Sequence, residues 1–141
     1  MINRRYTFSG LIALTALWAM PAVSADLELD VRNVRNAKGS VFAWLCEKEQ
    51  FLKQCAFSAT APAADGKILL KFKEVPAGRY AISAYHDENG NKKFDKNFLG
   101  IPTEGYGFSR DVKVRFGPPQ FEDAAFEIKD GGNLQELSLN Y

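Results

Sequence analysis

Four oxygen-bearing residues, Asp87, Asn89, Asn91 and Asp95, stand at relative positions 1, 3, 5 and 9 of one polar stretch. Side chains on alternate residues of a tightly coiled loop converge on one point, where Lys93 at position 7 can add its backbone carbonyl. Such hard oxygen ligands suit Ca²⁺ better than they suit softer transition metals. The spacing therefore predicts a calcium site in this loop.

The match to a calcium-wrapping turn is incomplete at two positions. Lys92 replaces the glycine expected at position 6, and Phe98 replaces the bidentate acid expected at position 12. A more distant carboxylate would have to complete the ligand set, and the candidates are Glu104, Glu122 and Asp123. With only two acids in the loop itself, the expected affinity is weak, towards the ~10⁻⁴–10⁻³ M range of extracellular modules.

A metal-free interpretation accounts for the same loop. Asn89-Gly90 is a favoured dipeptide for a tight turn, and Asn and Asp side chains satisfy the backbone of turns without any cation. Lys92, Lys93 and Lys96 also place positive charge beside the site. The predicted cofactor is therefore calcium or none.

The end of the same loop carries aromatic residues that could bind a ligand. Tyr106 has glycine on both sides, which frees its ring for contact, and Phe108 and Glu104 lie close to it in the chain. Exposed aromatic rings stack on sugars or anchor a protein partner. Alternatively the rings fill space beneath the loop, because Phe residues are mostly buried. We predict a ligand site at these three residues, with a protein or a glycan as the partner.

The sequence argues against an enzyme. His86 is the only histidine, and neither Ser83 nor Ser109 lies in a nucleophile-elbow pattern, so a hydrogen-bonded structural histidine is expected. Glu122 and Asp123 are adjacent, and adjacent side chains of an extended strand point to opposite faces. They therefore cannot act together on one substrate as a glycosidase pair. No catalytic residue is predicted.

Residues 1–25 have the features of a secretory signal peptide. A basic start at Arg4 and Arg5 leads into an apolar run over residues 11–20, and small residues end the segment at Ala25. The run is too short for a membrane span, which takes ~20 residues. We expect cleavage after Ala25, export to the periplasm or the medium, and one domain over residues 26–141 without membrane insertion.

Composition narrows the partners of the exported part. Cys46 and Cys55 are the only cysteines, and an exported pair at this spacing predicts a disulfide. Without Arg4 and Arg5 the 18 basic residues fall to 16, against 17 acidic ones. This near-neutral balance leaves no basic stripe to attract nucleic acid.

Periodicity of apolar residues predicts a chain built of strands. Alternation or short apolar runs predict strands over residues 27–34, 40–46, 67–75, 79–86 and 134–139. Pro76-Ala77-Gly78 predicts a hairpin turn between two of them. Residues 60–62 are expected in a loop, with short strands at 111–115 and 124–129. Together these predict a single-domain, all-β antiparallel β-sandwich, immunoglobulin-like or prealbumin-like, with about seven strands and one long ordered loop.

The stretch from His86 to Ser109, followed by residues 115–126 and a closing L-x-L-x-Y, resembles DUF2141, a bacterial family of exported domains of unknown function. The resemblance covers essentially all of residues 26–141. It implies a compact exported β-sandwich and no assigned reaction. Lys92 and Phe94 depart from the family pattern, which has Gly and Leu there.

Three functional hypotheses follow. The leading one is an exported, non-enzymatic binding or accessory domain with residues 86–108 and 116–126 as its recognition surface. The second is a structural module of the cell envelope that calcium makes rigid. The third is a hydrolase of unrecognised type, which requires two convergent carboxylates or a nucleophile facing His86.

Overall fold

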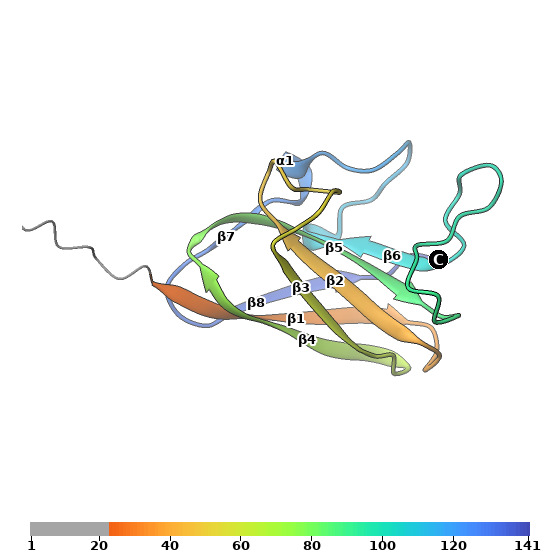
Figure 1. Cartoon of the computed structure of the whole chain (residues 1–141), viewed down its shortest axis with the longest axis horizontal. Helices are drawn as coiled ribbons and strands as arrows, with labels where there is room; N and C mark the ends of the chain where they lie inside the picture. The colour runs from red at the N-terminus through yellow and green to blue at the C-terminus, as the bar shows by residue number, and fades with distance from the viewer. Residues whose placement is uncertain (1–22) are drawn as a thin grey trace, which may run out of the picture.

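The computed structural model describes residues 23–141, which form eight strands with two short helical turns (Figure 1). The elements in chain order are β1 (Ser24–Val34), β2 (Ser40–Cys46), β3 (Phe57–Pro62), β4 (Gly66–Pro76), β5 (Gly78–Asp87), β6 (Gly105–Phe108), the 3₁₀ turn η1 (Ser109–Asp111), α1 (Phe121–Ala124), β7 (Phe126–Ile128) and β8 (Asn133–Ser138). The predicted signal peptide lies almost wholly outside the described residues.

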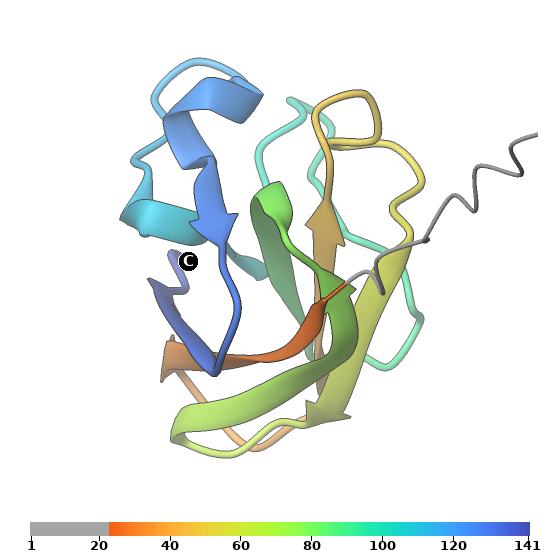
Figure 2. The same cartoon turned by 90° about the vertical axis from the view of Figure 1, so that its left-hand side faces the viewer.

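The strands form two sheets packed face to face. One sheet has the order β4-β1-β8, and the other has the order β3-β2-β5-β6, with β7 pairing to the first part of β5. Figure 2 shows the strands of the two sheets crossing obliquely. The predicted all-β sandwich is confirmed, with eight strands instead of about seven. One pairing, β1 with β8, is parallel, whereas the others are antiparallel.

The core lies between the sheets and follows from strand periodicity. Leu27, Leu29 and Val31 on β1 are fully buried, and they pack with residues of β2, β4, β5 and β8. On β2 the inward positions are Val41, Ala43 and Leu45, so every second residue points to the opposite face. That outer face of the five-stranded sheet is covered only in part.

A second apolar cluster covers one end of this outer face. Phe51, Phe108 and Phe121 pack there with Cys46 and with residues of α1. Because β5 lies between the core and this cluster, most of its residues are buried on both faces. The rest of the outer face is left for the aromatic residues of β2, β5 and β6.

The C-terminal residues connect the two sheets beside this face. Tyr106 on β6 and Asn140 exchange two backbone hydrogen bonds of 2.9 and 2.8 Å. Gly105 and Gly107 allow the close approach, because a Cβ at Gly105 would lie 2.3 Å from the Tyr141 ring and a Cβ at Gly107 would lie 2.6 Å from the Ser138 carbonyl oxygen. The glycines of β6 are therefore packing requirements.

Three local expectations were wrong. Strands β4 and β5 are not a hairpin, because β4 pairs with β1 in one sheet and β5 pairs with β2 in the other. Residues 60–62 belong to strand β3 at the edge of the larger sheet, and residues 111–115 form no strand. Among residues 23–141, no helix is both long enough and apolar enough to cross a membrane.

Candidate functional site

The outer face of the five-stranded sheet carries a continuous row of aromatic rings. Phe42 and Trp44 project from β2 on this face, and Tyr85 projects from the neighbouring strand β5. The Tyr85 ring lies 5.4 Å from each of the other two, centroid to centroid, at interplanar angles of 17° and 11°. Such close, near-parallel rings form a stacked apolar surface.

The row continues through the long loop and onto β6. Phe94 from the loop lies 5.5 Å from Tyr85 and 5.8 Å from Tyr106, again between ring centroids. Tyr106 in turn lies 6.2 Å from Phe108. Phe94 covers part of the row because it packs against both Tyr85 and Tyr106, and its own side chain is 36% exposed.

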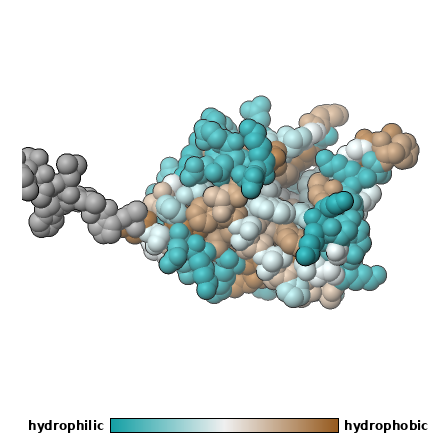
Figure 3. Space-filling view, viewed as in Figure 1, coloured by the Kyte–Doolittle hydropathy of each residue, from teal (hydrophilic) through white to brown (hydrophobic). Residues whose placement is uncertain are grey.

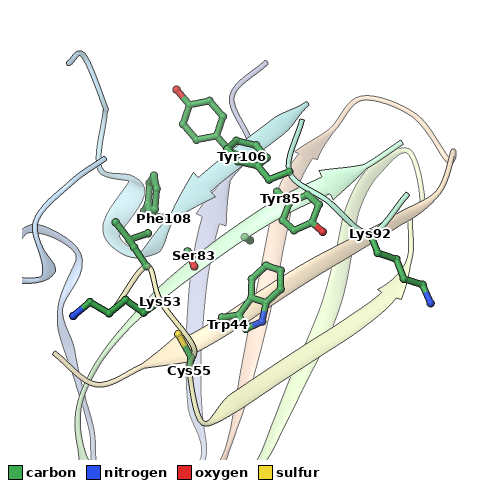
Figure 4. Close-up of a pocket in the computed structure, with 11 residues that line it drawn as sticks. Trp44, Lys53, Cys55, Ser83, Tyr85, Lys92, Tyr106 and Phe108 are labelled. Carbon is green, nitrogen blue, oxygen red and sulfur yellow. The ribbon is translucent and has the colours of Figure 1, made fainter. Parts of the chain in front are cut away.

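All of these rings except Phe42 line a hollow of about 370 Å³ on the sheet surface. Figure 4 shows Trp44, Tyr85, Tyr106 and Phe108 around it, with Lys53 and Lys92 at opposite ends. Its lining residues are Trp44, Leu52, Lys53, Cys55, Ser83, Ala84, Tyr85, Lys92, Phe94, Tyr106 and Phe108. The volume falls in the range of small-molecule sites, which are mostly apolar with a few polar groups.

The disulfide positions one wall of this hollow. Cys46 at the end of β2 is bonded to Cys55, as predicted, with 4.9 Å between their Cα atoms. The segment between them turns back over the sheet and places Leu52 and Lys53 at the rim. Gln50 holds this turn through its side-chain oxygen, which accepts a hydrogen bond from Ala56 N–H at 3.1 Å.

The opposite wall comes from the loop that follows β5. Asp87 is buried, and its carboxylate accepts hydrogen bonds from the N–H groups of Gly90, Asn91 and Lys92 at 2.8, 3.2 and 2.8 Å. These bonds coil the chain tightly around Asp87. Lys92 adopts the left-handed conformation at φ 59°, as the sixth residue of such a loop must.

Asp95 closes this turn from the other side. Its Oδ2 accepts hydrogen bonds from the side-chain amides of Asn89 and Asn91, both at 2.7 Å. The side-chain oxygens of those two residues accept N–H bonds from Asn91 and Lys93. The four side chains that the sequence spacing singled out are therefore brought together in one network.

Glu104 joins the same network. It lies immediately before β6 and is only 5% exposed, and its Oε2 accepts a hydrogen bond from Asp95 N–H at 3.1 Å. Burial raises the pKa of Glu104, and the negative charges of Asp95 and Asp87 raise it further, against the effect of backbone hydrogen bonds. Glu104 therefore faces the loop of Asp87 and Asp95, whereas Tyr106 and Phe108, predicted with it as one ligand site, line the hollow.

The hollow and the acidic loop meet at Tyr85. Burial raises the pKa of the Tyr85 hydroxyl, and the negative charges of Asp87, Glu104 and Asp95 raise it further. Tyr85 therefore stays neutral at physiological pH and keeps a proton to donate to a ligand.

His86 has a structural environment. It is fully buried, with Nδ1 2.8 Å from the Tyr141 hydroxyl and Nε2 2.6 Å from the Lys38 carbonyl oxygen. The Ser109 hydroxyl, in contrast, accepts a hydrogen bond from Ile82 N–H and donates one to the Ala124 carbonyl. Both ring nitrogens of His86 are thus engaged with partners other than a serine.

The adjacent acids near α1 are arranged differently from the expectation. Glu122 and Asp123 lie in the single turn α1, not in an extended strand. Glu122 binds Lys48 at 2.9 Å and Arg79 at 2.5 Å, and Asp123 caps α1 by accepting the Gln120 N–H. Of the three candidate distant carboxylates, only Glu104 is hydrogen-bonded to the predicted calcium loop.

Sequence reasoning missed the part of the site on β2. The run over residues 40–46 is almost continuously apolar, which predicts a central strand but does not distinguish its two faces. Phe42 and Trp44 alternate with the small or aliphatic residues Val41, Ala43 and Leu45. This segregation of large rings onto one face was the available indication of an aromatic surface.

Comparison with known proteins places the chain in a family. Residues 29–135 match the DUF2141 family, described as "Uncharacterized protein conserved in bacteria". The chain belongs to the DUF2141 family. The match includes most of this DUF2141 domain from β1 to β8, with the aromatic row and the acidic loop.

Two curated proteins are similar over a short stretch. They are "Signal peptidase I" of Streptococcus pneumoniae serotype 4 (strain ATCC BAA-334 / TIGR4) and of Streptococcus pneumoniae (strain ATCC BAA-255 / R6). Each is 38% identical over 48 residues, which are 34% of this DUF2141 chain and 24% of the relative. The chain thus spans about a quarter of the length of these relatives. No solved structure gives a significant match.

Proposed function

We propose that this DUF2141 chain is an exported, non-enzymatic binding domain that holds a glycan in the aromatic hollow. The observation that carries the proposal is the row of aromatic rings, five of which line a hollow of about 370 Å³: Trp44, Tyr85, Phe94, Tyr106 and Phe108. Aromatic faces arranged this way bind ring-shaped ligands by stacking, at little cost in side-chain freedom.

Polar groups at the hollow favour a glycan with acidic groups. The Tyr85 and Tyr106 side chains and the Ser83 hydroxyl supply hydrogen-bonding groups along its surface. Lys53 and Lys92 stand at its two ends and supply positive charge (Figure 4). A chain of sugars carrying carboxylates matches both features, since its rings stack while its charges reach the lysines.

The proposal retains the first predicted recognition segment, residues 86–108, keeps only Phe121 of the second, and adds the sheet. Lys92, Phe94, Tyr106 and Phe108 all belong to residues 86–108. The second predicted segment, 116–126, contributes Phe121, which packs 5.9 Å from Phe51 between ring centroids and supports the end of the hollow. Export is supported by the signal-peptide features of residues 1–25 and by the disulfide, because disulfides persist in oxidising compartments.

Trp44 makes the proposal testable by fluorescence, since it is the only tryptophan in residues 23–141. A panel of uronate-containing glycans, neutral glycans and proline-rich peptides would be titrated into the protein, and hits would be confirmed by calorimetry. Measured by calorimetry, which does not need the Trp44 fluorophore, Trp44→Ala and Tyr106→Ala are expected to weaken glycan binding at least tenfold, because stacked rings dominate such sites.

Phe116→Ala is the matched control, because Phe116 is almost fully exposed on another loop. It should leave glycan affinity unchanged. Near-UV circular dichroism would show that each variant keeps its packing. Binding that survives both Trp44→Ala and Tyr106→Ala, or a panel that yields only peptide ligands, would overturn the proposal.

A further inference from the structure

One carboxylate oxygen that faces the loop of Asp87 and Asp95 has no hydrogen-bond partner within residues 23–141. Glu104 is only 5% exposed, so more than nine-tenths of it is buried. Its Oε1 is out of contact with solvent, yet it accepts no hydrogen bond from the described residues. Its other oxygen is held by Asp95 N–H at 3.1 Å, which fixes the carboxylate against the loop. A buried, unpartnered carboxylate oxygen in a native fold requires an explanation, such as a bound ion.

The charges around Glu104 indicate the chemical class of partner that this carboxylate would bind. Asp87 and Asp95 are the other two acids of the loop, and their negative charges act on Glu104. Within residues 23–141, none of these three carboxylates has a Lys, Arg or His nitrogen within salt-bridge distance. Within residues 23–141 the three acids are therefore neighbours without a basic partner, although no three His, Cys, Asp or Glu side chains are close enough to hold a metal ion by themselves.

The lysines of the same loop do not fill this role. Lys96 directs its Nζ over the Phe94 ring, 5.6 Å from the centroid, and Lys92 lines the hollow. Lys93 is exposed. Positive charge is thus abundant in the loop but lies outside the acidic cluster.

Further oxygen donors lie in the same turn. The side-chain oxygens of Asn89 and Asn91 and the backbone carbonyl of Lys93 occupy positions 3, 5 and 7 of the loop that starts at Asp87. Together with three carboxylates they offer the six or more oxygen ligands that Ca²⁺ takes in a flexible shell. Mg²⁺ would demand a stricter octahedral geometry and retain more of its water.

We propose that Asp87, Asp95 and Glu104, with the oxygens of Asn89, Asn91 and Lys93, form a calcium site in which Glu104 takes the place of the acid missing at Phe98. The ligand that closes the shell comes from the start of β6 instead of the loop itself. The site thereby joins the end of β5 to the start of β6.

Turn hydrogen bonds alone do not account for this arrangement. They satisfy Asp87, Asn89 and Asn91, as the metal-free interpretation requires. They leave Glu104 buried next to two other acids with one oxygen unpartnered. A cation accounts for both groups of residues, because it neutralises the acids and occupies the free oxygen.

The proposed calcium loop also forms part of the wall of the hollow, because two of its residues, Lys92 and Phe94, line the hollow. The calcium proposal does not depend on a glycan ligand, because its own ligands do not line the hollow.

The test is a melting curve of the full chain, produced in a host with an oxidising periplasm and then freed of metal by a chelator. Adding 10 mM Ca²⁺ is expected to raise the Tm by roughly 4–8 °C, since a ligand of the native state stabilises by mass action. Adding 10 mM Mg²⁺ is expected to change the Tm by less than half as much. Calorimetry would give the stoichiometry, expected to be one.

Glu104→Gln distinguishes a lost ligand from a damaged fold. Without calcium this variant should melt at or above the wild-type Tm, because it removes a buried charge beside two like charges. With calcium it should lose most of the increase, as should Asp95→Asn. Glu122→Gln, which changes an exposed carboxylate paired with Lys48 and Arg79, is the matched control and should retain the full increase.

Three results would each overturn the proposal. They are a wild-type Tm unchanged by 10 mM Ca²⁺, an equal response to Mg²⁺, and a Glu104→Gln variant that keeps the wild-type calcium response.

Discussion

The N–H of Asp95 donates a 3.1 Å hydrogen bond to Oε2 of Glu104, nine residues further along the chain. This bond connects the acidic turn after β5 to the residue that precedes β6. Between them the chain runs out to an ordered tip, where Asn97 Oδ1 accepts the N–H groups of Leu99 and Ile101. The long loop therefore has a rigid base, on which Lys92 and Phe94 reach the hollow.

Lys92 is predicted to destabilise the folded state through its backbone conformation. Its φ of 59° lies in the left-handed region, which costs a non-glycine residue about 1–2 kcal/mol. Lys92→Gly removes this cost but gives the unfolded chain more freedom, so we expect a net gain of about 0.5 kcal/mol in the free energy of unfolding. Chemical denaturation in the presence of a chelator would measure it.

Lys93→Gly is the matched control, since Lys93 lies next in the loop and has no positive φ. It should lose about 0.5–1 kcal/mol, because glycine there only adds freedom to the unfolded chain. Equal effects of the two substitutions would contradict the assignment of strain to Lys92.

Gly107 is predicted to be intolerant of any side chain. A Cβ there would lie 2.6 Å from the Ser138 carbonyl oxygen and 3.0 Å from Leu137 Cδ1. The backbone carbonyl cannot move without disturbing β8, so Gly107→Ala should cost about 1–3 kcal/mol. Gly132→Ala, where a Cβ would meet nothing within 4 Å, should be nearly neutral. An equal loss of stability in both variants would show that conformational propensity, and not the contact of the new Cβ with the Ser138 carbonyl oxygen, determines the effect of Gly107→Ala.

These glycines show why β6 was not predictable from the sequence. Gly105 and Gly107 make up half of a four-residue strand, and glycine is a loop residue by propensity. Strand β6 forms because it pairs with β5 and because Tyr106 bridges to Asn140, tertiary contacts that local patterns do not contain. The strands with regular apolar alternation, such as β1, were predictable because their periodicity matches one buried face.

The connection at Pro76-Ala77-Gly78 shows a similar limit of local patterns. It has the residues of a tight turn, but β4 continues the pairing with β1 while β5 pairs with β2. A Pro-Ala-Gly sequence suits both a corner between two sheets and a hairpin turn within one sheet, so the local sequence does not distinguish the two. The spacing of the loop residues predicted that Asp87 and Asp95 lie together. It did not identify which of Glu104, Glu122 and Asp123 is the distant carboxylate beside them. Only the fold shows that it is Glu104.

Glu122 is predicted to contribute stability that depends on pH. Hydrogen bonds from Lys48 and then Arg79 lower the pKa of its carboxyl from the ordinary 4.5. A lowered pKa in the folded state means that the stabilisation is fully present above the unfolded pKa and disappears as the pH falls through the folded value. The difference in Tm between wild type and Glu122→Gln should therefore be present at pH 7 and become smaller at a pH well below 4.5.

Glu127→Gln serves as the comparison, because Glu127 lies 3.9 Å from Lys129 and both side chains are highly exposed. Exposed pairs of this kind contribute little, so its Tm should stay close to wild type at both pH values. A Glu122→Gln difference that grows at low pH would contradict the ion-pair assignment.

The disulfide is predicted to support both stability and the shape of the hollow. Cys46 and Cys55 are nine positions apart, and a crosslink that closes a loop of this size contributes about 2–3 kcal/mol by restricting the unfolded chain. Reduction should lower the free energy of unfolding by that amount in a denaturant titration. It should also release Leu52 and Lys53 from the rim of the hollow, because this bond ties the far end of their segment back to β2. The double variant Cys46→Ala/Cys55→Ala should reproduce the loss and show no further change on adding reductant, whereas equal denaturation midpoints for oxidised and reduced wild type would show that backbone hydrogen bonds alone hold the segment in place.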